Sequence, residues 1–374
     1  MQLQDFQIFR LRIPLKNRFP DALDARDTSE SVLLGVAGVD GRLGYGEGAP
    51  RQHATGETMD GTVFSLQNAI EFLRDAEIET VQDVARLLEA CPGLEYAPSA
   101  RCAAELALLD LLGKNDRTPV LNLLGEAQTE QIFYSAVISG ETPEAIQRQA
   151  QQAAVLRIRQ VKLNVGNDAA VNTRNIRLLR EILGENVDIR ADATAAWTEA
   201  EAAAQIGRLL DAGVFSVEQP LPDAGPRERW LALQTQLSRE ALVYVEESVC
   251  SYDDARWFAE RRAAAGFVLK ISKHGGILPS LDVHALAKEH GLFCQLGCHA
   301  GETSLLSAAG RIVAALTGDL RACEGSYGLQ VLEKDLTARP WQAGFQGIGP
   351  VAELLQPGLG VSVDLGLVGD RLSF

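Results

Sequence analysis

The stretch that decides the fold contains Val187-Asp-Ile-Arg-Ala-Asp192, Val214-Phe-Ser-Val-Glu218 and Leu242-Val-Tyr-Val-Glu246. Each segment is a short β-strand pattern that ends in a carboxylate, and a helix-type pattern follows each one. If the strands are parallel, their carboxyl ends lie at one edge and the three acids converge. Clustered carboxylates need a cation to offset their repulsion. The stretch therefore predicts a metal site built by Asp192, Glu218 and Glu246.

The same strand-helix unit continues on both sides of this stretch. Further strand patterns lie at 132–138, 160–165, 266–271, 292–296 and 321–324, with helical patterns between them. A unit of roughly 25 to 30 residues that recurs about eight times predicts an α/β fold of the TIM (β/α)₈ barrel type. A doubly wound open sheet is the alternative. It normally has a glycine-rich phosphate turn after its first strand, and Ser139-Gly140 is a poor match.

The regions before and after the barrel pattern do not alternate strand and helix patterns. The N-terminal part has alternating strand patterns at 7–13, 30–36 and 43–47, followed by helical patterns at 59–74, 81–89 and 99–114. Residues from 332 onward lose the strand-helix rhythm. The sequence predicts an α+β capping domain over 1–127 and a barrel over 128–330 that carries the site. It also predicts a C-terminal segment over 331–374 that returns to the capping domain.

The composition narrows the class of protein. The 374-residue chain is 46% hydrophobic and has no apolar run long enough for a membrane span. Its net charge of −15 argues against nucleic acid and anionic membranes as partners. The six cysteines include no Cys-x-x-Cys pair, which favours reduced thiols over zinc ligands. The N-terminus lacks the features of a signal peptide, so we expect a cytoplasmic protein.

The predicted ligand set contains only carboxylate oxygens, which suits a hard cation. Mg²⁺ is the expected cofactor and Mn²⁺ is the alternative. Zinc is disfavoured because no histidine or cysteine completes the set. A simpler interpretation of each acid is a solvated strand-end residue or an ion-pair partner of Arg190 or Lys162. The recurrence of an acid in three successive units favours the metal site.

Two lysines are predicted on either side of these acids. Because side chains alternate along a strand, Lys162 and Asn164 share one side of the second barrel strand, and Lys270 points inward from the sixth. Lys273 has the opposite parity and lies past the strand end. A lysine near a metal can remove a proton α to a carboxylate, because the cation stabilises the dianionic enolate. The alternatives are an ion pair between Lys162 and an acid, and a rim position for Lys270.

Five segments carry a resemblance to a known family. They are Gly44-Tyr-Gly-Glu-Gly-Ala-Pro50, Arg101-Cys-Ala-Ala-Glu-Leu-Ala-Leu-Leu-Asp110, Val217-Glu-Gln-Pro220, Glu246-Glu-Ser248 and Leu269-Lys-Ile-Ser-Lys-His-Gly-Gly276. In their order and spacing the chain resembles the enolase superfamily, in its muconate lactonizing enzyme and mandelate racemase branches. The resemblance implies that Asp192, Glu218 and Glu246 are the metal ligands. It also implies that Lys270 is an acid/base group.

One position departs from the family pattern. The second-strand motif of the family is usually Lys-x-Lys, with the second lysine as a base, whereas this chain has Lys162-Leu163-Asn164. Asn164 cannot take up the proton, and the resemblance gives Lys162 the role of a positive charge near the substrate carboxylate. His299 on the seventh strand is a candidate second acid/base group. The alternative for His299 is a rim histidine that hydrogen-bonds Glu324 or a substrate oxygen.

The predicted function is Mg²⁺-dependent removal of a proton α to the carboxylate of a small substrate, followed by isomerisation. The reaction would be of the racemase, epimerase or cycloisomerase type. A one-base lyase that catalyses syn-dehydration, like the o-succinylbenzoate synthases and some acid-sugar dehydratases, is the alternative that Asn164 favours. A non-catalytic binding protein on the same scaffold is the second alternative. The resemblance also implies a homo-oligomer and substrate-selecting loops near 16–23 and 51–55.

Overall fold

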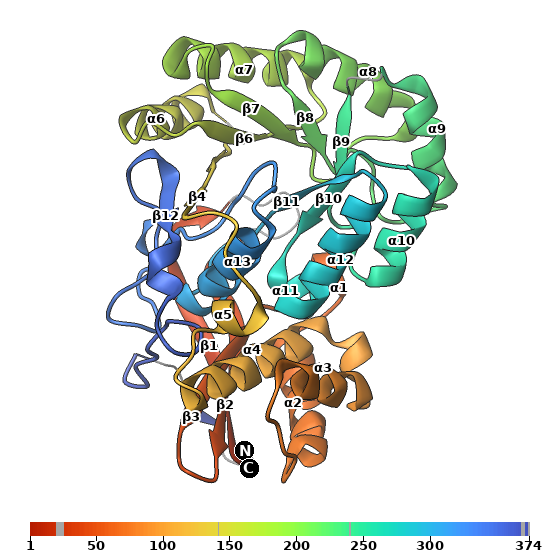
Figure 1. Ribbon diagram of the computed structural model, residues 1–374. Coiled ribbons are helices and arrows are strands. Elements are labelled where there is room, and N and C mark those ends of the chain that lie inside the picture. The colour runs from red at the N-terminus through yellow and green to blue at the C-terminus, as the bar shows by residue number, and fades with distance from the viewer. Residues whose placement is uncertain (20–25, 141, 239–240, 368–370, 373–374) are drawn as a thin grey trace.

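The computed structural model describes residues 1–19, 26–140, 142–238, 241–367 and 371–372 (Figure 1). Residues 20–23 of the loop that we expect to select the substrate lie outside this set.

The N-terminal residues form an antiparallel sheet, as their alternating apolar side chains predict. Its strands are β1 (Leu3–Phe19), β2 (Arg26–Gly38) and β3 (Leu43–Gly48), and β13 (Arg371–Leu372) pairs with the outer edge of β1. Helices α2 (Met59–Leu73), α3 (Val81–Ala90) and α4 (Pro98–Asn115) follow. The side chains of Thr58 and Thr80 accept hydrogen bonds from the first turns of α2 and α3, which fixes where these helices begin.

A curled parallel sheet follows in the chain and forms the barrel. Its strands are β5 (Ala136–Ile138), β6 (Gln160–Asn164), β7 (Asp188–Asp192), β8 (Ser216–Glu218), β9 (Leu242–Val245), β10 (Gly266–Leu269) and β11 (Phe293–Leu296), paired in that order. Cys323 makes parallel bridges to Leu296 and to Tyr134, so the two ends of the sheet approach each other where an eighth strand would lie. The predicted barrel-type fold is confirmed.

Two of the predicted strands differ from the structure. Residues 132–138 do not form one strand, because β4 (Gln131–Phe133) pairs with β12 (Ile348–Pro350) in a separate antiparallel sheet. The backbone N–H of Tyr134 donates to Gly347 and that of Ser135 donates to Cys323, so the chain changes partners within the run. The predicted strand at 321–324 is reduced to the bridges through Cys323.

Helices cover the outside of the parallel sheet (Figure 1). They are α6 (Pro143–Val155), α7 (Ala169–Leu183), α8 (Glu199–Asp211), α9 (Glu228–Gln236), α10 (Tyr252–Arg261), α12 (Ile277–Glu289) and α13 (Ser304–Thr317). The shorter helices α1 (Gln52–Thr55), α5 (Val120–Leu124) and α11 (Ile271–His274) lie in the connections between the larger elements. Within the described residues, every helix is too short or too polar to cross a lipid bilayer.

Two apolar clusters hold these layers together. One fills the space between the barrel strands and helices α6 to α10, around buried side chains such as Trp230 and Phe258. The other includes the capping sheet, α4, α13 and C-terminal residues such as Leu354. The carboxyl ends of the barrel strands therefore open toward a capping unit that shares a core with the last barrel helix.

Candidate active site

The strand-end acids lie close to one level of the barrel. Backbone pairing aligns Asn164 with Asp192, Asp192 with Glu218, and Glu218 with Tyr244 across β6 to β9. Glu246 follows Tyr244 by two residues, so strand alternation directs it to the same side. The structure thus brings the three predicted ligands to the carboxyl ends of the strands, where barrel enzymes build their active sites.

Lys162 lies among carboxylates. Its Nζ is 3.2 Å from Asp192 Oδ2, 3.3 Å from Glu218 Oε2 and 2.9 Å from Glu324 Oε2, and its side chain is 6% exposed. Burial alone lowers the pKa of Lys162, but the carboxylates outweigh this effect and hold the pKa well above its usual value. The ion-pair interpretation of Lys162 is correct for this structure, and the amine is a fixed positive charge.

Glu324 is a further site residue, expected from the sequence only as a hydrogen-bond partner of His299. Its second oxygen is 2.9 Å from the guanidinium of Arg190, which also donates to Gln295 at 2.7 Å and Ser135 at 3.1 Å. Glu324 therefore joins Lys162 to a buried polar network across the barrel interior. Its place at the end of the eighth predicted strand, like the three other acids, was the signal available in the sequence.

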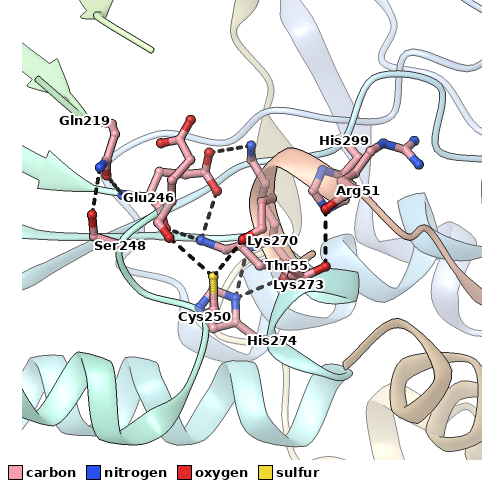
Figure 2. Close-up of polar contacts among 12 residues, drawn as sticks. Arg51, Thr55, Gln219, Glu246, Ser248, Cys250, Lys270, Lys273, His274 and His299 are labelled. Atoms are coloured by element: carbon pink, nitrogen blue, oxygen red, sulfur yellow. Dashed lines mark hydrogen bonds and ion pairs between the residues drawn. The ribbon is translucent and has the colours of Figure 1, made fainter. Parts of the chain in front are cut away.

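Glu246 is held by two lysines at the start of α11. Lys270 Nζ is 2.7 Å from Glu246 Oε2 and Lys273 Nζ is 2.9 Å from Oε1. Figure 2 shows the residues that surround Glu246. Lys273 also donates to the backbone oxygen of Glu246. The side-chain oxygen of Gln219 accepts a hydrogen bond from the backbone N–H of Glu246 at 2.8 Å. The inward position predicted for Lys270 agrees with this geometry. Lys273 reaches the same acid because β10 ends at Leu269 and the helical turn places the two lysines on one side.

The pKa values of Glu218 and Glu247 are raised in this crowded site. Burial raises the pKa of Glu218 to about 8, although Lys162 opposes the rise. Burial also raises the pKa of Glu247 well above its usual value, and the charges of Glu246 and Asp192 add to it. The Oε2 atom of Glu247 is buried and meets no hydrogen-bond donor in the described part of the chain.

His299 lies just past the end of β11. Its backbone N–H donates to Glu302 Oε1 at 2.7 Å, and its ring Nε2 is buried with no hydrogen-bond partner among the described residues. Burial, with the charges of Arg51 and Lys270, lowers the pKa of His299 well below its usual value, so the ring is neutral. No hydrogen bond to Glu324 is seen in the described residues, and the alternative rim role in that form is not observed.

Two further positions are Arg51, in the loop at 51–55 expected to select the substrate, and Asn164 on β6. Arg51 is 2% exposed, and its guanidinium donates to the backbone oxygens of Glu30, Pro50 and Ala300. It therefore ties the capping sheet to the loop after β11. The Oδ1 atom of Asn164 is buried and accepts no hydrogen bond from the described residues.

These residues fit a hard divalent cation by their chemistry. Within the described residues, no three His, Cys, Asp or Glu side chains are already gathered at metal-ligand spacing. Ammonium groups of Lys162 and Lys270 lie against the acids instead. The buried Glu247 Oε2 without a donor, together with oxygen-only donors on Asp192 and Glu218, matches the preference of Mg²⁺ or Mn²⁺.

Relatives in sequence point to one enzyme class. The chain is 27% identical to a hydrophobic dipeptide epimerase of Enterococcus faecalis, over 88% of this chain and 92% of that protein. It is 30% identical to a hydrophobic dipeptide epimerase of Citrifermentans bemidjiense, over 84% of this chain and 86% of that protein. It is 26% identical to an N-succinyl-L-Arg/Lys racemase of Bacillus cereus, over 84% of each.

Solved structures share the fold. The dipeptide epimerase of E. faecalis, complexed with Mg and L-Leu-L-Tyr, superposes with a TM-score of 0.86 at 23% identity, over 97% of this chain and all of that one. The N-succinyl Arg/Lys racemase of B. cereus gives 0.88 at 23% identity, over 100% and 99% of the chains. Residues 145–366 match the family described as enolase C-terminal domain-like. The chain belongs to the enolase superfamily, in the mandelate racemase and muconate lactonizing enzyme group, and is an isomerase of the epimerase or racemase type.

Proposed function

We propose that this isomerase inverts the carbon α to the carboxylate of a small amino-acid derivative, with Lys270 and His299 as the two acid/base groups. The observation that carries the proposal is that both side chains lie just past the carboxyl ends of the neighbouring strands β10 and β11 (Figure 2). Lys270 is a charged amine 2.7 Å from Glu246, and His299 is a neutral ring with a buried Nε2 that has no partner among the described residues. A proton donor and a proton acceptor are what a 1,1-proton transfer requires.

The cation belongs to this proposal. We assign Asp192, Glu218 and Glu246 as ligands of Mg²⁺, with Mn²⁺ as a substitute, because their donors are hard oxygens and a relative's structure contains Mg. When bound, the cation supplies positive charge to the carboxylate oxygens of the enolate. Lys162 keeps its charge beside the same acids and orients the substrate carboxylate. Asn164 is a neutral hydrogen-bonding group at the position where the family usually has a base.

The substrate class follows from the relatives. Those reported above act on dipeptides or on N-succinyl Arg/Lys, and both classes contain an amino acid with a free α-carboxylate. We expect the substrate to be a dipeptide or an N-acyl amino acid. The relatives are epimerases and a racemase, so the one-base lyase that Asn164 suggested is the less supported alternative.

Solvent exchange tests the proposal. Dipeptides and N-acyl amino acids are incubated in D₂O with Mg²⁺, and the α-position is followed by NMR and chiral chromatography. We expect deuterium incorporation with inversion, and Lys270→Ala should reduce the exchange rate by at least ~100-fold. His299→Asn should abolish inversion, because the neutral ring that accepts the proton is lost. Lys288→Ala, at a side chain that is 68% exposed, is the matched control and should behave as the unmodified protein.

Three results would contradict parts of this assignment. Undiminished exchange in Lys270→Ala would remove Lys270 as one of the two acid/base groups. Unchanged inversion in His299→Asn would show that the second acid/base group lies elsewhere. Elimination of water from acid sugars, without inversion of amino-acid derivatives, would favour the lyase.

We also propose that the protein forms a homo-oligomer in the cytoplasm. Phe64 and Phe72 are 64% and 41% exposed on α2, and a second copy of the chain packed against this helix would cover them. All six cysteines are free thiols, as a reducing compartment favours. Light scattering after size exclusion should give a mass of at least twice 40.3 kDa, and a monomer mass would contradict the assembly.

A further inference from the structure

The amino ends of the barrel strands carry a surface of arginines stacked on aromatic rings, which we call the arginine face. It consists of three pairs with 4.0 to 5.7 Å between the guanidinium carbon and the ring centre: Arg321 with Phe293, Arg159 with Phe133, and Arg157 with Phe345. At these distances the positive charge lies against the face of each ring, which holds the arginine side chains in place.

Further contacts join the three pairs into one surface. The backbone N–H of Gln346 donates to Leu156 at 2.7 Å, and its side chain accepts from Arg159 at 3.2 Å. Gln160, the first residue of β6, donates to the backbone oxygen of Arg321 at 3.2 Å. The arginine face therefore lies around the amino ends of the strands, on the side of the barrel away from the acids at their carboxyl ends.

The arginine face exposes both positive charge and apolar surface. Its three arginines are exposed, and two of its rings are more than one-third exposed: Phe133 at 39% and Phe345 at 54%. Among the described residues, none of the three guanidinium groups forms an ion pair. Asp188 accepts from Gln160 at 3.4 Å, and Asp319 is held by Lys288 at 3.1 Å. Arginine and aromatic side chains are enriched where proteins contact one another.

The capping domain has a surface of opposite charge at the end of α2 and in the turn after it, which we call the acidic strip. It contains two exposed phenylalanines and four exposed carboxylates: Phe64, Phe72, Glu71, Asp75, Glu77 and Glu79. Arg74 is the one basic residue between 71 and 79, and it lies over the ring of Phe6 at 6.0 Å. Phe64 and Glu71 are two helical turns apart, so they share one face of α2. The acidic strip thus combines negative charge with exposed rings.

We propose that copies of this chain associate head to tail, with the arginine face of one copy covering the acidic strip of the next. The inference rests on the proposed homo-oligomer and names its interface. Figure 1 shows α2 at the lower end of the molecule and α6, which precedes Arg157, at the upper end, so the two surfaces of one chain cannot meet. Each surface has the charge that the other lacks, and both have exposed rings that association would bury. A head-to-tail contact repeats from copy to copy and forms a ring when the rotation closes.

Charge reversal in the full-length protein tests this contact. The first variant replaces the arginines of the arginine face by glutamate: Arg157→Glu, Arg159→Glu and Arg321→Glu. The second replaces three carboxylates of the acidic strip by lysine: Glu71→Lys, Glu77→Lys and Glu79→Lys. The matched control reverses three exposed arginines on α7 and α8: Arg174→Glu, Arg177→Glu and Arg208→Glu. Sedimentation velocity measures the mass of each protein, and circular dichroism checks its fold.

We expect each of the two reversed variants alone to sediment at the monomer mass of 40.3 kDa, because like charges then face each other, whereas the control keeps the mass of the unmodified protein. An equimolar mixture of the two reversed variants should assemble again, since contacts between unlike copies pair opposite charges.

An unchanged mass in either reversed variant would overturn this contact and leave the proposed homo-oligomer standing. A mixture that stays monomeric, or a control that dissociates, would overturn it as well. A monomeric unmodified protein would contradict the homo-oligomer and this contact with it, and none of these results bears on the acid/base assignment.

Discussion

At the scale of single residues, Glu47 gives a prediction on pH and stability. Its side chain is fully buried on β3 and accepts hydrogen bonds from Ser31 at 2.7 Å and from Thr303 at 2.5 Å. Burial raises the pKa of Glu47 from 4.5 to about 7, against the effect of the two hydroxyls. The folded state therefore binds the proton more tightly than the unfolded state. Protonated Glu47 therefore stabilises the folded state. This contribution is fully present below about pH 4.5 and is lost as the pH rises through about 7.

Glu47→Gln should remove this pH dependence, because the amide imitates the neutral acid and both hydroxyls can donate or accept. We expect the free energy of unfolding to match the unmodified protein near pH 4.5 and to exceed it by about 3 kcal/mol at pH 8.5, since the pKa rises from 4.5 to about 7. Urea unfolding at both pH values, followed by circular dichroism, measures the difference. A variant that is less stable at pH 8.5 would show that Glu47 is ionised and stabilised by its hydrogen bonds.

The residue scale also shows what the sequence could predict about the site. Lys162 and Asp192 lie within strands and follow the alternation rule, and Lys270, the first residue after β10, still keeps the direction that its parity predicts. The rule fails past a strand end, because the backbone there is turned or helical. Lys273 and Glu247 lie in such positions, and only the three-dimensional path of the chain brings them to Glu246 and the other acids.

At the scale of elements, the packing of β3 on α4 depends on three glycines. Gly44, Gly46 and Gly48 alternate along the strand, and a Cβ on each would overlap a backbone oxygen of α4 at Ala107, Ala103 and Ser99 respectively. Two residues of strand advance about 6.8 Å and four residues of helix about 6 Å, so each glycine meets the next turn of the helix. The absence of side chains lets the two backbones touch.

Gly46→Ala should therefore separate β3 from α4. The added Cβ would lie under 3.0 Å from backbone atoms of α4, which cannot move without shifting a helix that is buried along most of its length. We expect the free energy of unfolding to fall by about 3 kcal/mol or more, in the range of overpacked cores. Gly207→Ala on α8 is the control, because its Cβ meets nothing within 4 Å and alanine favours helix by about 1 kcal/mol. Equal stability of the two variants in urea unfolding would contradict the close-packing account.

Element prediction from the sequence succeeded where one periodicity ran without interruption. The strands that end in acids and the helices after them have such runs, and the structure contains them as β7, β8 and β9 with α8, α9 and α10. The prediction of one strand over 132–138 is wrong, because residues of this run pair in two different sheets. The change of partner at Tyr134 depends on a hydrogen bond to Gly347, which is remote in sequence. Local patterns carry no information on such a partner.

At the scale of the whole molecule, the three predicted parts, 1–127, 128–330 and 331–374, share one hydrophobic core. One apolar cluster contains Leu106 of the capping region, Leu296 and Ile312 of the barrel region, and Leu359 of the C-terminal segment. Separate domains usually unfold in separate steps. A core that crosses all three parts should instead make them unfold together, because exposing one part would strip the others of their apolar contacts.

Tryptophan reporters can test this cooperativity within single variants. Trp341 lies in the shared cluster, whereas Trp197, Trp230 and Trp257 belong to or pack against the barrel cluster. Trp341→Phe leaves only barrel reporters, and a triple Trp→Phe variant at the other positions leaves only Trp341. In each variant we expect the fluorescence midpoint in urea to coincide with the midpoint of far-ultraviolet circular dichroism. A Trp341 transition at lower urea than the loss of helix signal would show that the cap and C-terminal segment release before the barrel, and that the shared core does not couple them.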